Sequence, residues 1–574
     1  MEPATASERL IAAHRPAGCE SWRRRGRAWT VTAFALTAAF SLNQGAPGDQ
    51  PRGCSIVKST FVVFFLCAAF LFAAFCIAGC SDREDVAERP NVAKRPNVAK
   101  RPNVLLIVID TLRADHAGCY GYERATTPRL DALAAEGILF ENTLSQAAFT
   151  LPSMATLFTS LNPINHGVRR HPDSQAGTVD ALPGDLDTLP KTLKGKGYST
   201  AAVISNSLFQ SRFKAGFEAG FDTFEVGRGR PDAARTTDRA IAWLDGRRDG
   251  DSPFFFWVHY IDPHWPYDPP ADFEHPFTHD DGGQYSRLLK GFFRNLRSGG
   301  AMAEGGDTGI PREIINFDPP LDAEGLAAGI AAYDSEVTFA DAQMGRLLDY
   351  LRAKGLDERT LIAVVSDHGE ALGEHSLTFS HNYTLYEEML RVVQIIRPPG
   401  GRTPPVRISS QVRLLDFAPT ILAMLGIEPF DRTEGRDLSP LWLKGEEAIE
   451  EAPAYAESDV WPARVPGSRY ASLSRKLPRG NAGKWKMVRY RGFKLIWIPG
   501  NGRELYDLSA DPGELRNLAA DPPAAARPLA GILKRYITEP EERGGSRDSS
   551  LGPDLNADTR AELEELLRSM GYAN

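Results

Sequence analysis

Cysteine is scarce in this chain of 574 residues. Four of its six cysteines precede residue 77 and a fifth is Cys80, so Cys119 is the only one in the remainder of the sequence. A lone cysteine cannot form an internal disulfide, and a free cysteine of this kind is usually a packing residue. The part of the chain after residue 80 must therefore be held together by its hydrophobic core.

A dense stripe of lysine and arginine interleaved with aromatic residues is also absent. The net charge is only -8, and the composition is 42% hydrophobic and 24% charged. These values are typical of an ordinary globular protein with more than one packed unit. They exclude nucleic acid as an expected partner.

One long apolar run stands near the N-terminus. Lys58 is followed by apolar residues from 59 to 76 and then by Ile77-Ala78-Gly79-Cys80. A basic residue, an apolar core and small residues are the pattern of an export signal, and this ending resembles the lipobox of bacterial lipoproteins, with Cys80 as the lipidation site. The alternative is a transmembrane anchor. Both interpretations predict an exported protein held to a membrane of the bacterial cell envelope.

Residues 1–79 are thus interpreted as an upstream extension and export signal. Residues 80–101 contain the hexapeptide Arg-Pro-Asn-Val-Ala-Lys twice, at 89–94 and 95–100. This repeat is too short for a solenoid unit, and its proline and charge favour an extended tether.

From Val104 onward, apolar runs alternate with helical patterns. The predicted strands are 104–109, 199–204, 254–260, 361–365 and 392–396, and the predicted helices are 129–137, 189–197, 236–245 and 324–354. Near-continuous apolar runs are typical of parallel strands buried on both faces. The sequence therefore predicts an α/β fold with a central, mostly parallel sheet flanked by helices.

We expect the catalytic domain to span 102–436, with an insertion at about 272–321 that is rich in glycine and basic residues. Residues 437–574 are predicted to form a smaller α+β C-terminal subdomain. In it, 485–497 alternates as one strand would, and 504–514 is typical of a hairpin return.

Acidic and imidazole side chains follow the predicted strands. Asp110 follows the first, His259, Asp262 and His264 close or follow the third, and Asp367, His368 and Glu370 follow the fourth. Open parallel sheets bind their ligands at this edge, so these groups could hold a divalent cation with the oxygen of Thr150. Each also has a simpler interpretation, since aspartate often ends strands in turns and threonine often caps helices.

Several ordered segments resemble the sulfatase family of the alkaline-phosphatase superfamily. They are 101–122, 127–137, Asn165-His-Gly-Val168, Asp262-Pro-His264, 365–375 and Glu504-Leu-Tyr-Asp-Leu508 with Asp511-Pro-Gly-Glu514. The resemblance implies a metal held by Asp110, Asp367 and His368, and contacts of His264 and His381 with an anionic substrate or its leaving group. We also place Asn206 and His259 among the substrate-binding residues. Asn206 falls near the position of a lysine and a histidine in sulfatases.

Two departures from that family bear on the chemistry. Sulfatases need Cys or Ser at the position of Thr150, which is oxidised to formylglycine, and Arg at the position of Met154. Thr111 replaces the second Asp of the usual Asp-Asp pair. The first departure predicts that Thr150 itself is the nucleophile, independent of formylglycine. The second weakens a Ca²⁺ site, so Mn²⁺ or Zn²⁺ is favoured as the single divalent ion.

The leading hypothesis is a metal-dependent hydrolase of phosphate or sulfate esters, with Thr150 as covalent nucleophile and His264 or His381 as proton donor. The nucleophile favours phosphate and the resemblance favours sulfate. Two alternatives are a transferase of phosphoryl-linked groups to the cell envelope and a binding protein on an inactive sulfatase fold.

Overall fold

The computed structural model describes most of the chain from residue 101 onward. The described residues are 101–168, 181–210, 215–227, 232–248, 252–274, 276–297, 321–382, 384–402, 404–458, 485–499, 502–538 and a few between 561 and 570. The predicted export signal, Cys80 and the tether lie outside them. Within these ranges, no helix combines the length and the apolar character that crossing a bilayer requires.

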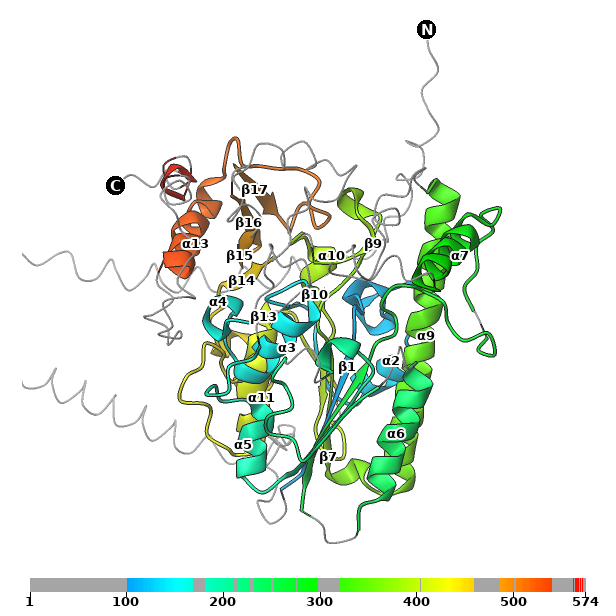
Figure 1. Cartoon of the computed structure of the whole chain (residues 1–574). Coiled ribbons are helices and arrows are strands. Elements are labelled where there is room, and N and C mark those ends of the chain that lie inside the picture. The colour runs from blue at the N-terminus through cyan, green and yellow to red at the C-terminus, as the bar shows by residue number, and fades with distance from the viewer. Residues whose placement is uncertain are drawn as a thin grey trace, which may run out of the picture. The chain divides into compact units, whose positions relative to one another are not determined.

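An eight-stranded sheet forms the centre of the fold (Figure 1). Its order is β12 (Val406–Ile408), β2 (Ile138–Phe140), β11 (Gln394–Arg397), β7 (Thr360–Ser366), β1 (Asn103–Ile109), β6 (Phe254–Tyr260), β4 (Ser199–Ile204) and β5 (Thr223–Val226). Every residue of β1, β6 and β7 is buried, which explains their unbroken apolar runs. The five predicted strands of this sheet are confirmed, except that 392–396 is divided between β11 and the two-residue strand β10 (Arg391–Val392).

The strands β7, β1, β6, β4 and β5 are parallel, whereas β11 runs antiparallel to β7. The sequence prediction grouped this run with the parallel strands, and that was wrong for β11. Among the described residues between β7 and β11, no crossover helix carries the chain back to the end of the sheet where β7 begins. The chain therefore enters β11 from the opposite end, and β11 is antiparallel to β7. β7 and β11 are both fully buried although they run in opposite directions, so the apolar pattern of the sequence does not distinguish a parallel from an antiparallel strand.

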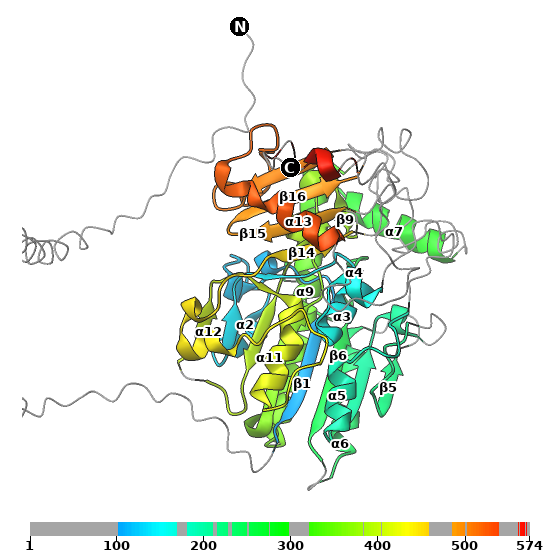
Figure 2. The same ribbon diagram turned by 90° about the vertical axis from the view of Figure 1, so that its left-hand side faces the viewer.

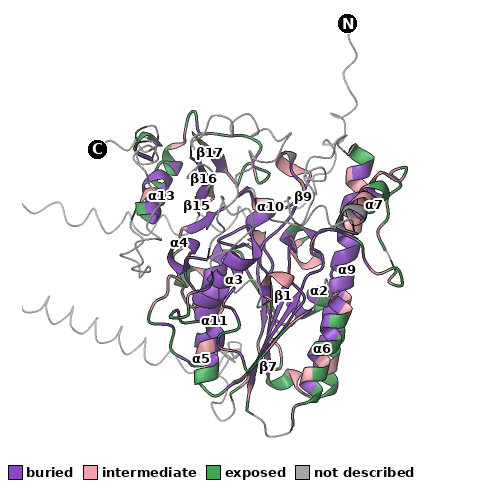
Figure 3. Cartoon of the chain, in the orientation of Figure 1, coloured by how far each residue is buried: buried purple, intermediate pink, exposed green. Residues whose placement is uncertain are grey.

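Helices cover both faces of the sheet (Figure 2). The helices α3 (Thr150–Thr159), α5 (Leu189–Gly195) and α11 (Phe417–Met424) pack on the face that carries Val104, Leu106 and Val108 of β1. The helices α2 (Pro128–Ala134), α6 (Ala233–Asp245) and α9 (Ala323–Ala353) pack on the face that carries Leu105 and Ile107. The four predicted helices, α2, α5, α6 and α9, are confirmed. In Figure 3 the central strands have the colour of buried residues, whereas α6 also carries exposed ones.

A separate four-stranded antiparallel sheet follows in the chain. It consists of β14 (Ala454–Glu457), β15 (Lys486–Tyr490), β16 (Phe493–Ile498) and β17 (Gly502–Asp507), and helix α13 (Pro528–Thr538) packs against it. The segment 485–497, predicted as one strand, is in fact two strands. A tight turn at Arg491 and Gly492, with φ of 51° and 78°, joins them. Glycine at the second position of such a hairpin turn was the available signal.

The predicted insertion contains a helix, α7 (Gln284–Arg297). The hydroxyl of Tyr285 donates a hydrogen bond of 2.9 Å to the backbone carbonyl of Tyr267, so this helix packs beside the loop that follows β6. Residues 298–320 of the insertion lie outside the part of the chain that the structure describes.

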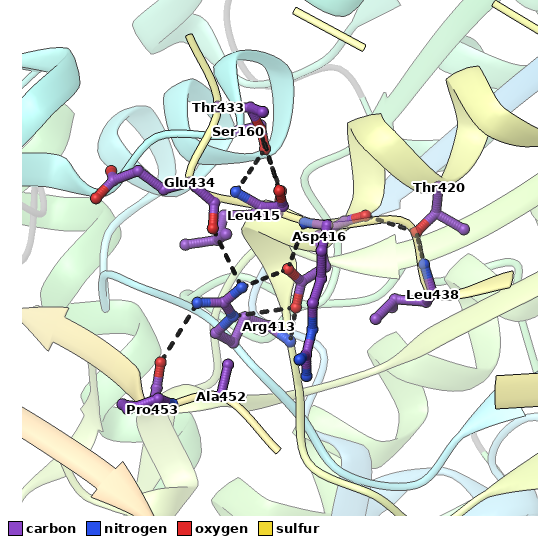
Figure 4. A network of polar contacts seen from close by, with 12 residues as sticks. Ser160, Arg413, Leu415, Asp416, Thr420, Thr433, Glu434, Leu438, Ala452 and Pro453 are labelled. Atoms are coloured by element: carbon purple, nitrogen blue, oxygen red, sulfur yellow. Dashed lines mark hydrogen bonds and ion pairs between the residues drawn. The ribbon is translucent and has the colours of Figure 1, made fainter. Parts of the chain in front are cut away.

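A polar network fixes the C-terminal end of α3 (Figure 4). Ser160 has a left-handed conformation, and its Oγ donates 2.7 Å to the carbonyl of Leu415 and accepts 3.2 Å from the backbone N–H of Gly435. The ion pair of Arg413 and Asp416, at 2.7 Å, braces the same segment. Because α3 is a rigid rod, fixing its end also fixes its first residue, Thr150.

Candidate functional site

Three candidate metal ligands meet at the carboxyl edge of the large sheet. Asp110 follows β1, and Asp367 and His368 follow β7. The two strands are parallel neighbours, with Ile109 opposite Ser366, so the residues after them emerge side by side. One ligand atom from each of the three residues lies within 4.8 Å of the others, and all three side chains are fully buried.

Each carboxylate keeps one oxygen unoccupied. Asp110 Oδ1 and Asp367 Oδ2 have no hydrogen-bond partner among the described residues. The other oxygen of Asp367 accepts from the backbone N–H groups of Thr111, at 3.2 Å, and His368, at 2.9 Å. Buried carboxylate oxygens without donors are rare in proteins, and a bound cation would account for both.

The imidazole of His368 is oriented to complete this site. Its Nδ1 lies 2.9 Å from the carbonyl of Gly369 and must donate to it, so in the neutral ring Nε2 is the nitrogen that carries the lone pair. Nε2 lies 3.5 Å from Asp367 Oδ2 and 3.9 Å from Asp110 Oδ1. A histidine held through its other ring nitrogen is the usual arrangement at a metal. Two carboxylates and one imidazole fit a divalent ion such as Mn²⁺ or Zn²⁺.

The electrostatics of the two carboxyl groups also fit a cation. Burial and the charge of Asp110 raise the pKa of Asp367 above its usual value. Burial also acts to raise the pKa of Asp110, but the hydrogen bond with His259 and the neighbouring imidazoles outweigh it and lower that pKa. Two buried carboxylates facing one another repel unless a positive charge lies between them.

Thr150 lies beside this cluster. It is the first residue of α3, and its Oγ1 is 3.3 Å from His368 Nε2. Phe149 is the N-cap residue and no side-chain cap bond is present, so Thr150 does not cap the helix. One turn later, Ser153 Oγ donates 2.6 Å to the carbonyl of Asp367, which attaches the helix directly to the metal-ligand segment.

Two further imidazoles flank the site. The ring of His381 lies 4.5 Å from that of His368, and the ring of His264 lies 4.9 Å from that of His381, measured between centroids. His381 Nδ1 contacts Glu370 Oε1 at 3.0 Å. Burial raises the pKa of Glu370 to about 7. Of the two predicted proton donors, His381 therefore lies next to the candidate ligand His368, and His264 lies next to His381.

Asn206 and His259 both contact Asp110. Asn206 Nδ2 donates 2.7 Å to Asp110 Oδ2, and His259 Nε2 lies 3.2 Å from the same oxygen. These two contacts leave Asp110 Oδ1 for a cation. The sequence analysis predicted that both residues contact the substrate, and this stays a prediction. It did not predict their contacts with Asp110. The register of β4, β6 and β1 carries that signal, because Ile204 pairs with His259 and Ile109 with Tyr260.

Arg113 and Gly369 are functional candidates that the sequence did not single out, whereas Glu370 was noted there with Asp367 and His368 at the end of the fourth predicted strand. Arg113 is buried, and its guanidinium donates 3.0 Å to the carbonyl of Glu370 and 2.8 Å to the Glu374 carboxylate. It therefore fixes both ends of the loop after the metal ligands. Burial lowers the pKa of Arg113, but the charges of Asp115 and Glu374 outweigh it, so the net pKa is raised and the side chain stays charged.

We expect Asn206→Ala to weaken metal binding about 10–100-fold, the usual cost of losing an outer partner of a ligand. Without the amide donor, Asp110 Oδ2 is free to rotate toward the cation and the carboxylate loses its orientation. Titration calorimetry with Mn²⁺ measures the change. Gln210→Ala, which removes an amide bound only to the Gly227 carbonyl, is the matched control and should bind normally. Equal affinities for both variants would contradict the role assigned to Asn206.

His375, in the loop after the metal ligands, makes the stability of the protein depend on pH. Its Nδ1 contacts Glu388 Oε1 at 2.9 Å and its Nε2 contacts the Glu514 carbonyl at 3.3 Å. Neither acceptor can donate, so the ring carries both protons. Burial acts to lower the pKa of His375, but the Glu388 carboxylate and the Glu514 carbonyl outweigh it, and the pKa is raised above 6.5.

Because this pKa is raised in the folded state, the stabilisation is complete below pH 6.5 and is lost as the pH rises through the folded-state value. We expect wild type to exceed His375→Gln in unfolding free energy by about 1–3 kcal/mol at pH 6, with a smaller difference at pH 9. Urea titrations of both proteins between these pH values measure it. A difference that does not change with pH would contradict the charged ring.

The chain matches two protein-family models. The model described as Sulfatase covers residues 102–427, and the model of the N-sulphoglucosamine sulphohydrolase C-terminal region covers 373–540. An arylsulfatase of Clostridium perfringens is 26% identical in an alignment of 467 positions that covers 72% of this chain and 89% of the relative. A Delta 4,5-hexuronate-2-O-sulfatase of Bacteroides thetaiotaomicron is 26% identical in an alignment of 481 positions that covers 79% of this chain and 92% of the relative.

Solved structures have the same fold. The phosphonate monoester hydrolase of Agrobacterium radiobacter superposes with a TM-score of 0.59 at 22% identity, covering 78% of this chain and 97% of the other. The predicted α/β fold with its mostly parallel sheet is thereby confirmed. Because the first model spans more than half of the sequence and the ordered motifs lie where the site is built, the chain belongs to the sulfatase family.

Proposed function

We propose that the protein is a metal-dependent hydrolase of anionic esters, with Thr150 as its covalent nucleophile, and that its substrates are phosphate or phosphonate esters. The observation that carries the proposal is the position of Thr150 Oγ1, 3.3 Å from His368 Nε2, which itself lies 3.5 Å and 3.9 Å from the two carboxylate oxygens that have no donor. A hydroxyl there attacks an anionic centre held at the cation site and the start of α3.

The identity of residue 150 favours phosphorus over sulfur. Oxidation of a threonine gives a ketone, not the aldehyde of formylglycine, and buried Met154 stands where the maturation motif has Arg. An unmodified alcohol must form an ester with the transferred group. Water then has to cleave that ester at the central atom, a reaction well suited to phosphoryl and phosphonyl groups.

The residues divide the work as follows. Thr150 Oγ1 releases its proton to solvent and bonds to phosphorus while the bond to the leaving alcohol breaks, and His264 or His381 protonates the leaving oxygen. Water then attacks the phosphorus of the threonine ester: its hydroxyl stays on phosphorus, its proton returns to the histidine, and the released threonine oxygen takes up a proton from solvent. A divalent ion held by Asp110, Asp367 and His368 would lower the pKa of the hydroxyl and offset the charge of the substrate.

The proposal is tested with aryl phosphomonoester, phosphodiester, phosphonate and sulfate substrates, each with Mn²⁺, Zn²⁺ or Ca²⁺. We expect turnover of at least one phosphorus ester with Mn²⁺ or Zn²⁺, and a mass adduct on the peptide carrying Thr150 after rapid acid quenching. Turnover of sulfate alone, with an aldehyde or ketone at residue 150, would overturn the proposal. Product that forms only when an acceptor alcohol is added would favour a transferase, and protein that binds no divalent ion would favour the binding role.

We also propose that the enzyme works outside the cytoplasm, attached to a membrane by a lipid on Cys80. The apolar run 59–76 and the ending Ile77-Ala78-Gly79-Cys80 support this. We expect Cys80→Ala to abolish incorporation of labelled fatty acid in a bacterial host. Incorporation equal to that of the wild type would place the lipid elsewhere.

A further inference from the structure

A second buried polar cluster lies between the C-terminal sheet and the short helix α10 (Glu387–Leu390). We call it the Glu387 cluster, and its members are His375, Glu387, Glu388, Arg489, Lys494 and Glu514. At its centre, Lys494 of β16 is fully buried, and its Nζ lies 3.1 Å from Glu387 Oε1 and 3.0 Å from Glu514 Oε1. Buried ion groups contribute little net stability, so a cluster of this size calls for another role.

The cluster fixes the first turn of α10 from three directions. Glu514 Oε2 accepts the backbone N–H of Glu387 at 2.6 Å. Lys494 holds one carboxylate oxygen of Glu387, and Arg489 holds the other at 2.8 Å. The helix is thus attached to β15, β16 and the segment Asp511-Pro-Gly-Glu514, all of which lie in the C-terminal part of the chain.

The other end of α10 lies directly against the metal site. The N–H of Gly369 donates 2.8 Å to the carbonyl of Met389. A Cβ on Gly369 would lie 1.9 Å from the carbonyl oxygen of Glu388, so no side chain fits between α10 and this residue. The carbonyl of Gly369 in turn accepts from His368 Nδ1 at 2.9 Å and sets the direction of the imidazole.

We propose that Lys494 and Glu514 are positioning residues for the metal ligand His368, acting through α10 and Gly369. The C-terminal subdomain then holds in place the backbone carbonyl that orients the imidazole. This inference rests on the proposed function, because it assumes that His368 binds the catalytic metal. It also gives a physical role to the Asp511-Pro-Gly-Glu514 segment, which lies far along the chain from all of the candidate ligands.

The test is the affinity for Mn²⁺, measured by titration calorimetry on the full folded domain, with melting temperatures recorded in parallel. Lys494→Met removes the cation between two buried carboxylates, of which Glu387 keeps Arg489, and should displace α10. We expect its Kd to rise at least about tenfold, as for loss of an outer partner of a ligand. Glu514→Gln keeps an acceptor for the Glu387 N–H but loses the charge, so a smaller rise in the same direction is expected, and this milder variant serves if Lys494→Met does not fold.

Leu533→Ala is the matched control. Leu533 is buried in α13 against the same sheet, so its truncation destabilises the C-terminal subdomain without touching α10. We expect a lower melting temperature and an unchanged Kd for Mn²⁺. If Lys494→Met and Glu514→Gln bind Mn²⁺ as wild type does, or if Leu533→Ala weakens binding as much as they do, the positioning role is overturned.

The outcomes also separate this inference from the proposed function. Wild-type protein that binds no divalent ion overturns both. Weakened Mn²⁺ binding in the cluster variants, together with full turnover by Thr150→Ala, keeps the positioning role and overturns the nucleophile. Normal Mn²⁺ binding in those variants, together with an adduct on Thr150 in wild type, overturns the positioning role and keeps Thr150 as the nucleophile.

Discussion

Thr150→Ala is expected to lower kcat/KM at saturating metal by at least about 10³-fold and to abolish the covalent adduct. The next hydroxyl along α3 is not free to replace it, because Ser153, one turn further on, donates its hydroxyl to the Asp367 carbonyl at 2.6 Å. Removing a nucleophile that works with partner groups costs nearly the whole chemical acceleration and leaves only the contribution of binding. Thr150→Ser keeps the hydroxyl and should stay within about tenfold of wild type.

Thr159→Ala is the matched control for this experiment. Thr159 lies on the same helix and is equally buried, but its hydroxyl donates to the carbonyl of Ala155 at 2.7 Å and accepts from the backbone N–H of Leu161 at 3.3 Å, at the far end of the helix. Steady-state rates on the best substrate and intact-mass spectra of quenched reactions give the two readouts. Full turnover by Thr150→Ala would show that another group attacks the substrate, and an equal loss in Thr159→Ala would point to a damaged helix.

Much of this fold could be predicted from the sequence because the central strands are buried on both faces. A strand buried on both faces has a continuous apolar sequence, as in β1, β6 and β7. The polar residues on either side of that sequence mark where the strand begins and ends. Whether a buried strand runs parallel or antiparallel to its neighbour does not change this apolar pattern. The antiparallel course of β11 follows from the chain that precedes it, and the hairpin at Arg491-Gly492 interrupts an alternation that continues on both sides.

The candidate ligands could be predicted for a similar reason. Asp110 and Asp367 each directly follow an apolar run, and parallel neighbours bring their carboxyl ends together. The residues that orient them could not be predicted. Asn206, after β4, reaches Asp110 across the intervening strand β6, and Glu514 reaches Glu387 over 127 positions of sequence. Such contacts depend on how the loops and the second sheet pack, which local patterns do not encode.

Asp367→Asn is expected to raise the stability of the metal-free protein while abolishing its response to metal. In wild type, burial and the Asp110 charge raise the pKa of Asp367. A carboxyl group of this kind destabilises the folded state once the pH exceeds its unfolded value of about 3.8, so the advantage of asparagine grows as the pH rises from there to the raised folded-state pKa of Asp367 and is constant above it. The amide can still accept from the N–H groups of Thr111 and His368.

The amide nitrogen also gives Asp110 Oδ1 a donor that it lacks, which we expect to stabilise the metal-free protein by about 1–3 kcal/mol at pH 7. The same donor occupies the place of the cation. At an ion concentration 100-fold above Kd, wild type should gain about 2.7 kcal/mol of unfolding free energy, and the variant should gain none. Urea titrations with EDTA or with Mn²⁺ measure both effects.

Asp341→Asn tests whether these effects belong to the metal site or to any buried aspartate. Asp341 accepts from the backbone N–H groups of Arg129 and Leu130 at the start of α2, and burial raises its pKa to about 7. Its replacement should leave the gain from Mn²⁺ unchanged, since neither of these contacts involves a candidate ligand. If Asp367→Asn still gained stability from Mn²⁺, or if its metal-free form were less stable than wild type at neutral pH, the facing carboxylates would not be the cation site. We expect Asp367→Asn to be more stable than wild type without metal and to gain no stability from Mn²⁺. This combination requires that the rest of the fold hold Asp110 and Asp367 together against their own repulsion.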